Sequence, residues 1–408
     1  MTLKIERLGH LGDGIATGPV FVPRALPDEV VDGEVVEGVL AAPKIVTPSE
    51  HRVKAPCRHY NACGGCAVQH ADDAFVANWK LTVVRTAVAA QGMEAKIRGI
   101  ETSPPNARRR AKLSGRRTKK GAIVGFHARG SDTLTPVPDC KVLTSEILAV
   151  LPVLETLTTG IASRKGEVSY TITASENGLD LAVDGAKDMT DVLRFEMAQF
   201  AQDARLARLS WNGELLLTLA APTQQFGDVV ITPPPGAFLQ ATKHGEVTLL
   251  SAVQEATQGA KAILDLFAGC GTFALPLAKR ASVHAIEAVP DMIEALDAGW
   301  RKSKGLKKVT SETRDLYRRP LDADELKSFD AVVIDPPRAG AEAQVHYITG
   351  SNIAQVAFVS CNPVTFARDA KILTDGGYTL NWVTVVDQFR WSPHVELAAS
   401  FMRTDMSV

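Results

Sequence analysis

The stretch Ala262-Ile263-Leu264-Asp265-Leu266-Phe267-Ala268-Gly269-Cys270-Gly271-Thr272-Phe273 carries the strongest fold signal in this chain. Its apolar first half predicts a buried strand, and the residues after the glycines predict the start of a helix. Glycines at such a turn let a ligand approach the backbone closely. Glu287 ends the next predicted strand, about 20 residues beyond Asp265, where a carboxylate can hold two ribose hydroxyls. The spacing favours an adenosyl ligand.

Two other interpretations of this stretch stay open. A dinucleotide would use a third glycine at the position of Ala274, and alanine is an accepted variant there. A plain strand-to-helix turn would need the same glycines without any ligand.

From residue 240 onward, strand-like and helix-like segments alternate, which predicts an α/β fold with a doubly wound parallel sheet. Ligands of such sheets bind at the carboxyl ends of the strands. The tail adds two strands, 380–386 and 395–401, expected to form an antiparallel hairpin. The expected segments before it are strand 261–267, helix 273–280, strand 282–287, helix 291–304, strand 330–334, helix 341–350, strand 354–360 and helix 364–374.

The chain before residue 240 has a different pattern, with short strands and many turns. Residues 1–50 predict a small β-barrel, a helix is expected over 74–92, and β-rich hairpins are expected from about 98 to 235. The breaker Pro233-Pro234-Pro235-Gly236 predicts a domain border. We therefore expect three domains, 1–50, 51–235 and 236–408.

Reactive side chains follow the later predicted strands. Asp335-Pro336-Pro337-Arg338 places a carboxylate in a rigid turn, and Cys361-Asn362-Pro363 places a thiol before a capped helix. The helix N-terminus is expected to stabilise the thiolate, so Cys361 is a candidate nucleophile. Glu396 opens the last strand and is a candidate acid or base. The alternatives are a plain turn, a buried structural cysteine and an exposed strand end.

The chain resembles the uracil-5 RNA methyltransferase family, and specifically its ribosomal-RNA branch. The resemblance covers nearly the whole length and is carried by several motifs in order. They are Cys57, Cys63-Gly64-Gly65-Cys66, Gln69-His70, Cys140, Phe238-Leu239-Gln240, Asp335-Pro336-Pro337-Arg338, Ser360-Cys361-Asn362-Pro363 and His394-Val395-Glu396.

The resemblance implies a fold, a cofactor and a role for each site residue. It implies a TRAM-type β-barrel, an iron–sulfur central domain and a Rossmann-like methyltransferase domain that uses S-adenosylmethionine. Cys361 corresponds to the nucleophile and Glu396 to the proton acceptor. The positions that correspond to cofactor-binding residues are Gln240, Phe267, Glu287 and Asp335.

These residue types suit methylation of uracil C5, which is a poor nucleophile by itself. A thiolate that adds to C6 creates an enolate whose C5 can attack a methyl group, and a base must then remove the C5 proton. The target base must leave the RNA stack before the thiol can reach it. Large-subunit (23S) ribosomal RNA is the expected substrate. The alternatives are the T-loop of transfer RNA, base N-methylation and a non-catalytic RNA-binding protein.

Four cysteines form a candidate metal site, with Cys57, Cys63 and Cys66 close together and Cys140 remote. A tight triplet with a distant fourth thiol favours a [4Fe-4S] cluster, and the resemblance supports it. A four-cysteine zinc site is the alternative, although such sites usually contain two close pairs.

Composition limits how the chain can bind RNA. Its 45 Lys and Arg balance 46 Asp and Glu, so RNA binding must come from local patches. Such a patch is predicted at Arg108, Arg109, Arg110, Lys112, Arg116, Arg117, Lys119 and Lys120, with a solvated face as the alternative. The absence of a long apolar run and of a signal-peptide pattern predicts a cytoplasmic protein with no membrane partner. A monomer is expected.

Overall fold

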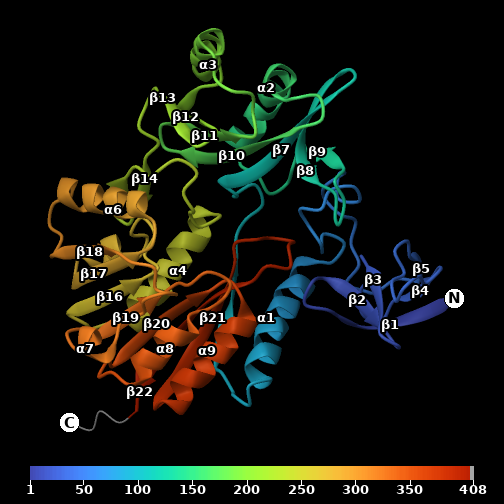
Figure 1. The fold of residues 1–408 in the computed structure, drawn as a ribbon. Coiled ribbons are helices and arrows are strands. Elements are labelled where there is room, and N and C mark those ends of the chain that lie inside the picture. The colour runs from blue at the N-terminus through green and yellow to red at the C-terminus, as the bar shows by residue number, and fades with distance from the viewer. Residues whose placement is uncertain (405–408) are drawn as a thin grey trace.

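The computed structural model describes residues 1–404, which form three large sheets and one two-stranded sheet (Figure 1). The N-terminal sheet has five antiparallel strands in the order β3-β2-β1-β4-β5. Ile5, Val22 and Leu40 lie in its small core. The strands are β1 (Thr2–Leu8), β2 (Asp13–Ala16), β3 (Val20–Pro23), β4 (Val30–Asp32) and β5 (Lys44–Thr47).

The central sheet has seven strands in the order β13-β12-β11-β10-β7-β8-β9 and carries two helices. The helices α2 (Ser145–Ile161) and α3 (Asp191–Asp203) bury Leu151, Leu154 and Met197 in its core. The strands are β7 (Arg110–Thr118), β8 (Gly121–His127), β9 (Leu134–Pro136), β10 (Glu167–Ser175), β11 (Gly178–Asp184), β12 (Leu206–Trp211) and β13 (Glu214–Thr218).

The third sheet has eight strands in the order β18-β17-β16-β19-β20-β22-β21-β6. Its first five strands are parallel, and β22 inserts antiparallel between β20 and β21. The strands are β6 (Ile97–Thr102), β16 (Ala262–Leu266), β17 (Ser282–Glu287), β18 (Val309–Thr313), β19 (Ala331–Ile334), β20 (Gln355–Ser360), β21 (Tyr378–Asp387) and β22 (Glu396–Arg403).

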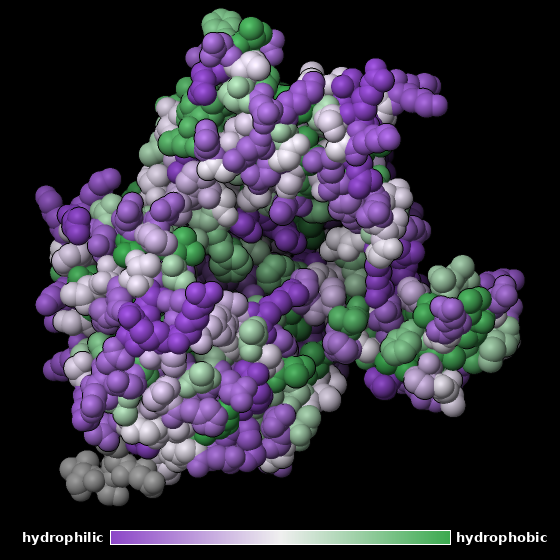
Figure 2. All heavy atoms as spheres, viewed as in Figure 1, coloured by the Kyte–Doolittle hydropathy of each residue, from purple (hydrophilic) through white to green (hydrophobic). Residues whose placement is uncertain are grey.

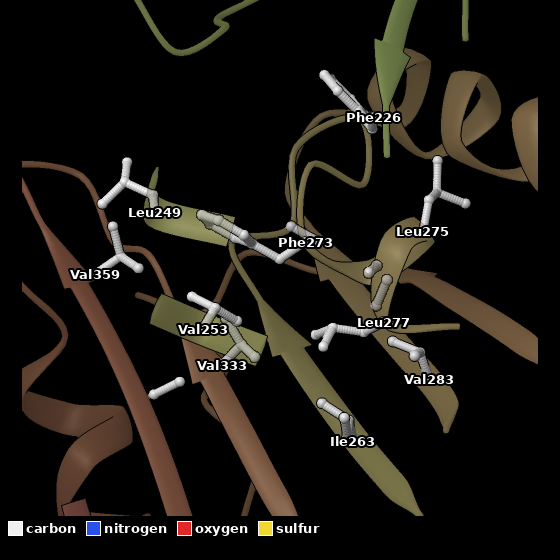
Figure 3. Packing of buried hydrophobic residues seen from close by; sticks show 14 of the residues in the cluster. Phe226, Leu249, Val253, Ile263, Phe273, Leu275, Leu277, Val283, Val333 and Val359 are labelled. Atoms are coloured by element: carbon white, nitrogen blue, oxygen red, sulfur yellow. The ribbon is translucent and has the colours of Figure 1, made fainter. Parts of the chain in front are cut away.

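Helices cover both faces of this sheet, which explains why its strands are continuous apolar runs. Successive strand residues point to opposite faces, so Ile263 joins one core and Leu264 the other. Figure 3 shows the first core, where Phe226 of the hairpin β14 (Gln224–Phe226) and β15 (Val229–Ile231) packs near Leu275. The helices are α1 (Asp73–Ala89), α4 (Lys243–Ala256), α5 (Ala274–Leu277), α6 (Pro290–Lys302), α7 (Ala323–Leu326), α8 (Glu342–Thr349) and α9 (Pro363–Asp375).

The predicted α/β fold and the antiparallel tail hairpin are confirmed. The N-terminal sheet is antiparallel and resembles a TRAM-like domain, as expected. The assignment of β6 to the central hairpins is wrong, because β6 pairs in parallel with β21 and α1 packs beside it. The segment 73–102 thus contributes a strand and a covering helix to the third sheet (Figure 1).

No helix within residues 1–404 is both long and apolar enough to span a bilayer. The carboxyl ends of the parallel strands point toward the central sheet (Figure 1). Figure 2 shows the surface hollowed between these two parts of the molecule. The fold therefore brings the strand ends, where ligands bind in such sheets, next to the central sheet.

Candidate active site

The register of the third sheet brings Cys361 and Glu396 together. Ser360, the last residue of β20, pairs with Leu397 of β22, and Cys361 and Glu396 are the next residues along the two antiparallel strands. The charge on Glu396 affects the pKa of Cys361, which agrees with this proximity. Asp335 follows β19, the neighbouring strand, and its charge affects both residues. The structure therefore gathers the predicted nucleophile, the predicted proton acceptor and one predicted cofactor residue at one sheet edge.

The Cys361 thiol lies just before α9, whose N-cap Asn362 accepts a hydrogen bond from the Val364 N–H. Burial, together with the charges of Glu396 and Asp335, raises the pKa of this thiol to about 11, while Arg338 lowers it. The sequence predicted a thiolate stabilised by the helix N-terminus. In the protein by itself, burial and the two carboxyl groups oppose this stabilisation.

The Glu396 and Asp335 carboxyl groups both favour the protonated form. Burial and the charge of Asp335 raise the pKa of Glu396 to about 8, against hydrogen bonding by Gln388 and the charge of Arg338. Burial raises the pKa of Asp335 to about 7. Carboxyl groups with pKa values near neutrality can exchange protons at physiological pH, as acid–base catalysis requires.

The turn after β16 presents its backbone at the same edge. Phe267 has a φ of 61°, a left-handed conformation that is costly for a bulky residue and typical of functional sites. Gly271 has a φ of 89°, and a Cβ there would lie 2.8 Å from Leu275 Cγ, so only glycine fits. The Gly269 N–H donates to Glu287 Oε2 at 3.0 Å, which fixes this carboxylate beside the turn. A ribose-binding role for Glu287 fits this position, since carboxylate oxygens accept several hydrogen bonds.

The fourth predicted cofactor residue, Gln240, lies before α4 and is buried. Its Nε2 donates to Asp335 Oδ2 at 3.4 Å, and its Oε1 accepts from Gln388 Nε2 at 2.6 Å. All four predicted cofactor residues thus lie in the strand-end region, two of them in direct contact.

The four predicted metal ligands line one small cavity of about 40 Å³, together with Arg108 and Phe126. All four are free thiols: Cys57, Cys63, Cys66 and Cys140. A Cβ on Gly64 would lie 2.7 Å from the His127 carbonyl oxygen, so glycine lets the cysteine loop approach β8. Within residues 1–404, no group of three or more His, Cys, Asp or Glu side chains is arranged to hold a single metal ion.

The predicted phosphate-binding stripe is only partly exposed. Arg109 is buried, forms an ion pair with Glu246 at 2.5 Å and donates to the Gln240 carbonyl oxygen. Arg110 donates to the carbonyl oxygens of Gly236 and Ala237. These arginines join β7 to the segment that carries Gln240, so the prediction that they bind phosphates is wrong. Lys112, Arg117, Lys119 and Lys120 remain exposed.

Comparison with known proteins shows which family this chain is similar to. Residues 229–404 match the family model described as tRNA (Uracil-5-)-methyltransferase. An uncharacterized RNA methyltransferase of Rhizobium meliloti (strain 1021) is 41% identical, over 98% of each chain. A 23S rRNA (uracil(1939)-C(5))-methyltransferase RlmD of a Shewanella species (strain ANA-3) is 31% identical, over 98% of this chain and 95% of its own.

The chain belongs to the RNA (uracil-5-)-methyltransferase family. As a member of it, the chain is an S-adenosylmethionine-dependent enzyme, and dinucleotide binding and a non-catalytic role are set aside. A solved structure shares the fold, with a TM-score of 0.78 and 23% identity over 98% of this chain and 99% of the other. It is a Pyrococcus abyssi tRNA (uracil-54, C5)-methyltransferase in complex with S-adenosyl-L-homocysteine.

Three residues of this methyltransferase site were missed by the sequence analysis. The charge of Arg338 lowers the pKa of Glu396, and Gln388 is hydrogen-bonded to Gln240. Lys80 of α1 is buried under the loop between β21 and β22. Arg338 stood in a quoted motif, but no role followed from it. Gln388 and Lys80 belong to no spacing pattern, because only the packing of α1 and β21 brings them to the site.

Proposed function

We propose that this enzyme methylates C5 of a uridine through a covalent adduct between Cys361 and C6 of the base. The observation that carries the proposal is the pairing of Ser360 with Leu397, which brings the adjacent residues Cys361 and Glu396 to the same edge of the sheet. A nucleophile and a base on adjacent strands can act on the adjacent carbons C6 and C5 of one ring.

In the proposed reaction, the Cys361 sulfur bonds to C6 and the electrons of the C5–C6 double bond form the new bond between C5 and the methyl carbon. Glu396 then accepts the C5 proton, the double bond forms again and the sulfur leaves C6. S-adenosylmethionine supplies the methyl group and departs as S-adenosylhomocysteine. Gln240, Phe267, Glu287 and Asp335 would hold this donor at the strand ends.

The thiol must lose its proton before it attacks, and its pKa of about 11 opposes this step. A cationic donor placed near Asp335 would weaken the repulsion that keeps the thiol neutral. We therefore infer that binding of the cationic donor favours the thiolate form of Cys361.

We propose large-subunit (23S) ribosomal RNA as the substrate. The full-length relative from Shewanella, whose name specifies 23S rRNA, supports this choice. The T-loop of transfer RNA is the second candidate, favoured by the family model that covers residues 229–404. Mapping 5-methyluridine in total RNA from a deletion strain distinguishes the two, because only one RNA loses the modification.

We also propose that Cys57, Cys63, Cys66 and Cys140 hold a [4Fe-4S] cluster. Each thiolate of a cubane binds a different iron, so the four sulfurs surround a volume and do not converge on one ion. The shared cavity fits this requirement, and the Gly65 N–H donates to Cys63 Sγ at 3.3 Å, a contact of the kind that tunes such clusters. Free thiols suit a reducing cytoplasm, where we place the enzyme as a monomer. We propose the domain division 1–50, 51–235 and 236–408, in which β6 of the second domain completes the sheet of the third.

The covalent step is tested with target RNA that carries 5-fluorouridine. Fluorine cannot leave as a cation, so Glu396 has nothing to accept and the protein stays attached to methylated RNA. We expect an adduct that resists denaturation, needs S-adenosylmethionine and is absent from Cys361→Ala. If Cys361→Ala methylates RNA at the wild-type rate, the nucleophile is wrong and base N-methylation becomes the better proposal.

A further inference from the structure

The loop between β21 and β22, residues 388–395, is hydrogen-bonded to the segment that carries three of the four clustered cysteines. We call this segment, residues 57–70, the cysteine loop. The N–H groups of Ala67 and of the next residue both donate to the carbonyl oxygen of Trp391, at 2.8 and 3.1 Å. Ala67 directly follows Cys66 in the chain. The two loops are therefore joined by backbone bonds beside a proposed metal ligand.

The position of Ala67 depends on the fold of the cysteine loop itself. The Tyr60 hydroxyl donates to the Ala67 carbonyl oxygen, and the Cys57 N–H donates to Gln69 Oε1 at 3.1 Å. Metal binding and local folding are coupled, because the ligands of a metal site are gathered only in the folded chain. Occupancy of the four cysteines would therefore help to hold the two N–H donors in place.

Trp391 is the residue of the β21–β22 loop that these donors hold. Its φ is 60°, a left-handed conformation that is costly for a bulky side chain. Its ring is buried in a cluster with Leu26, Val68 of the cysteine loop and Trp79 of α1. Such a conformation persists only where surrounding contacts impose it. The ring packing and the two N–H donors are the contacts that impose it here.

The same loop also contacts the turn beside the nucleophile. The guanidinium of Arg338 donates from Nη2 to His394 Nδ1 at 2.9 Å. Burial lowers the pKa of His394 to about 4, so the ring is neutral and can accept this bond. The Arg338 carbonyl oxygen accepts from Asn362 Nδ2 at 3.0 Å, and Asn362 directly follows Cys361. The loop then ends at Glu396, the first residue of β22.

We propose that Trp391 is a positioning residue that anchors the β21–β22 loop on the cysteine loop, so that occupancy of the four-cysteine site sets the geometry around Cys361 and Glu396. The proposal rests on the proposed function, which assigns those two roles and the metal site. Without a metal, the cysteine loop would no longer hold Trp391, and the loop would relax. A misplacement of about 1 Å can cost a reaction about a hundredfold in rate.

Variants at both ends of this connection test it. Trp391→Leu removes ring contacts and keeps an apolar side chain, and Trp391→Phe is the conservative replacement. Cys140→Ser removes one proposed ligand from outside both loops. Trp300→Leu on α6 is the matched control for the loss of a tryptophan, and Cys270→Ser is the matched control for the loss of a thiol.

Hydrogen exchange followed by mass spectrometry should show the amides of residues 388–395 exchanging about tenfold faster in Trp391→Leu and in Cys140→Ser. Iron should stay bound in Trp391→Leu and be lost from Cys140→Ser. Adduct formation on 5-fluorouridine RNA should slow about tenfold in both, and Trp391→Phe should recover most of the wild-type rate. Neither control should change exchange in this loop, and Trp300→Leu should form adducts at the wild-type rate.

Unchanged exchange of these amides in Cys140→Ser would overturn the proposal, because the loop would then not depend on the cysteine site. Faster exchange with a wild-type rate of adduct formation would overturn it as well, since the anchor would then position nothing. An increase spread evenly over the whole chain would show a purely structural role and contradict it too. A wild-type enzyme that forms no adduct would instead refute the covalent mechanism, while the exchange measurement would still test the anchor.

Discussion

Lys80 Nζ lies 2.6 Å from Asp387 Oδ1, and both side chains are almost completely buried. The same ammonium group donates to the carbonyl oxygens of Phe389 at 3.2 Å and His394 at 3.0 Å. Its three donors are therefore all used. Helix α1 thus fixes both ends of the loop that leads to Glu396.

Replacing Lys80 with methionine should destabilise the protein by about 3–5 kcal/mol, because it leaves the Asp387 carboxylate buried without a partner. The loss should be visible in denaturant unfolding followed by circular dichroism. The double variant Lys80→Met with Asp387→Leu should recover much of it, since no uncompensated charge remains. A single variant as stable as the wild type would show that water replaces the lysine.

The protein without added ligands should become less stable as the pH rises from about 5 to 8.5. Burial raises the pKa of Glu396 to about 8 and that of Asp335 to about 7, above their ordinary values. The folded state then holds protons that the unfolded chain has released, so this contribution is complete at low pH and is lost as the pH passes these values.

Thermal unfolding measured across that pH range tests the sign. Glu396→Gln should flatten the decline because one titrating group is gone. Glu325→Gln should leave the slope unchanged, since a hydrogen bond from Arg314 lowers the pKa of Glu325 to about 2, below the window. A wild-type melting temperature that rises over this range would contradict the prediction.

Protein purified without oxygen should be brown and carry about four irons per chain. Cys140→Ser should lose iron and lower the melting temperature. Cys270→Ser should keep the iron, because Cys270 lies elsewhere, beside Met292. If the protein instead carries stoichiometric zinc and no acid-labile sulfide, the four cysteines form a zinc site and the cluster assignment is wrong.

The exposed end of the basic stretch should bind RNA phosphates. Neutralising Arg117, Lys119 and Lys120 should weaken RNA binding and reduce the salt slope by about 0.7 for each phosphate that is no longer neutralised. S-adenosylmethionine affinity should stay unchanged. Neutralising Arg301 and Lys302 on α6 is the matched control. If the salt slope of RNA binding is unchanged when Arg117, Lys119 and Lys120 are neutralised, these residues form a solvated face and do not bind RNA.

Arg109 should behave differently from these exposed cations. Because it is buried and paired with Glu246, Arg109→Ala should lower the melting temperature and weaken S-adenosylhomocysteine binding through Gln240. The matched change Lys112→Ala, at an exposed position of β7, the strand that follows Arg109, should do neither. Equal effects of the two would contradict the role given to Arg109.

Six of the eight strands of the catalytic sheet could be predicted from the amino-acid sequence, because these strands are local patterns of apolar residues bounded by glycines and caps; β18 and β6 could not. The turn after Leu266 and the cap at Asn362 needed no information from elsewhere in the chain. Order along the chain also placed Asp335 and Cys361 at strand carboxyl ends, where parallel strands bring side chains together.

Features that depend on distant packing could not be predicted in this way. The pairing of β6 with β21, the burial of Arg109 and the neutral thiol of Cys361 each result from neighbours far away in the sequence. Burial removes water from a charged group and shifts its pKa, so that the neutral form is favoured. The extent of this burial is not encoded in any local sequence pattern. The same holds for Gln388, whose amide meets Gln240 and the Ala241 N–H only because the end of β21 packs against the segment before α4.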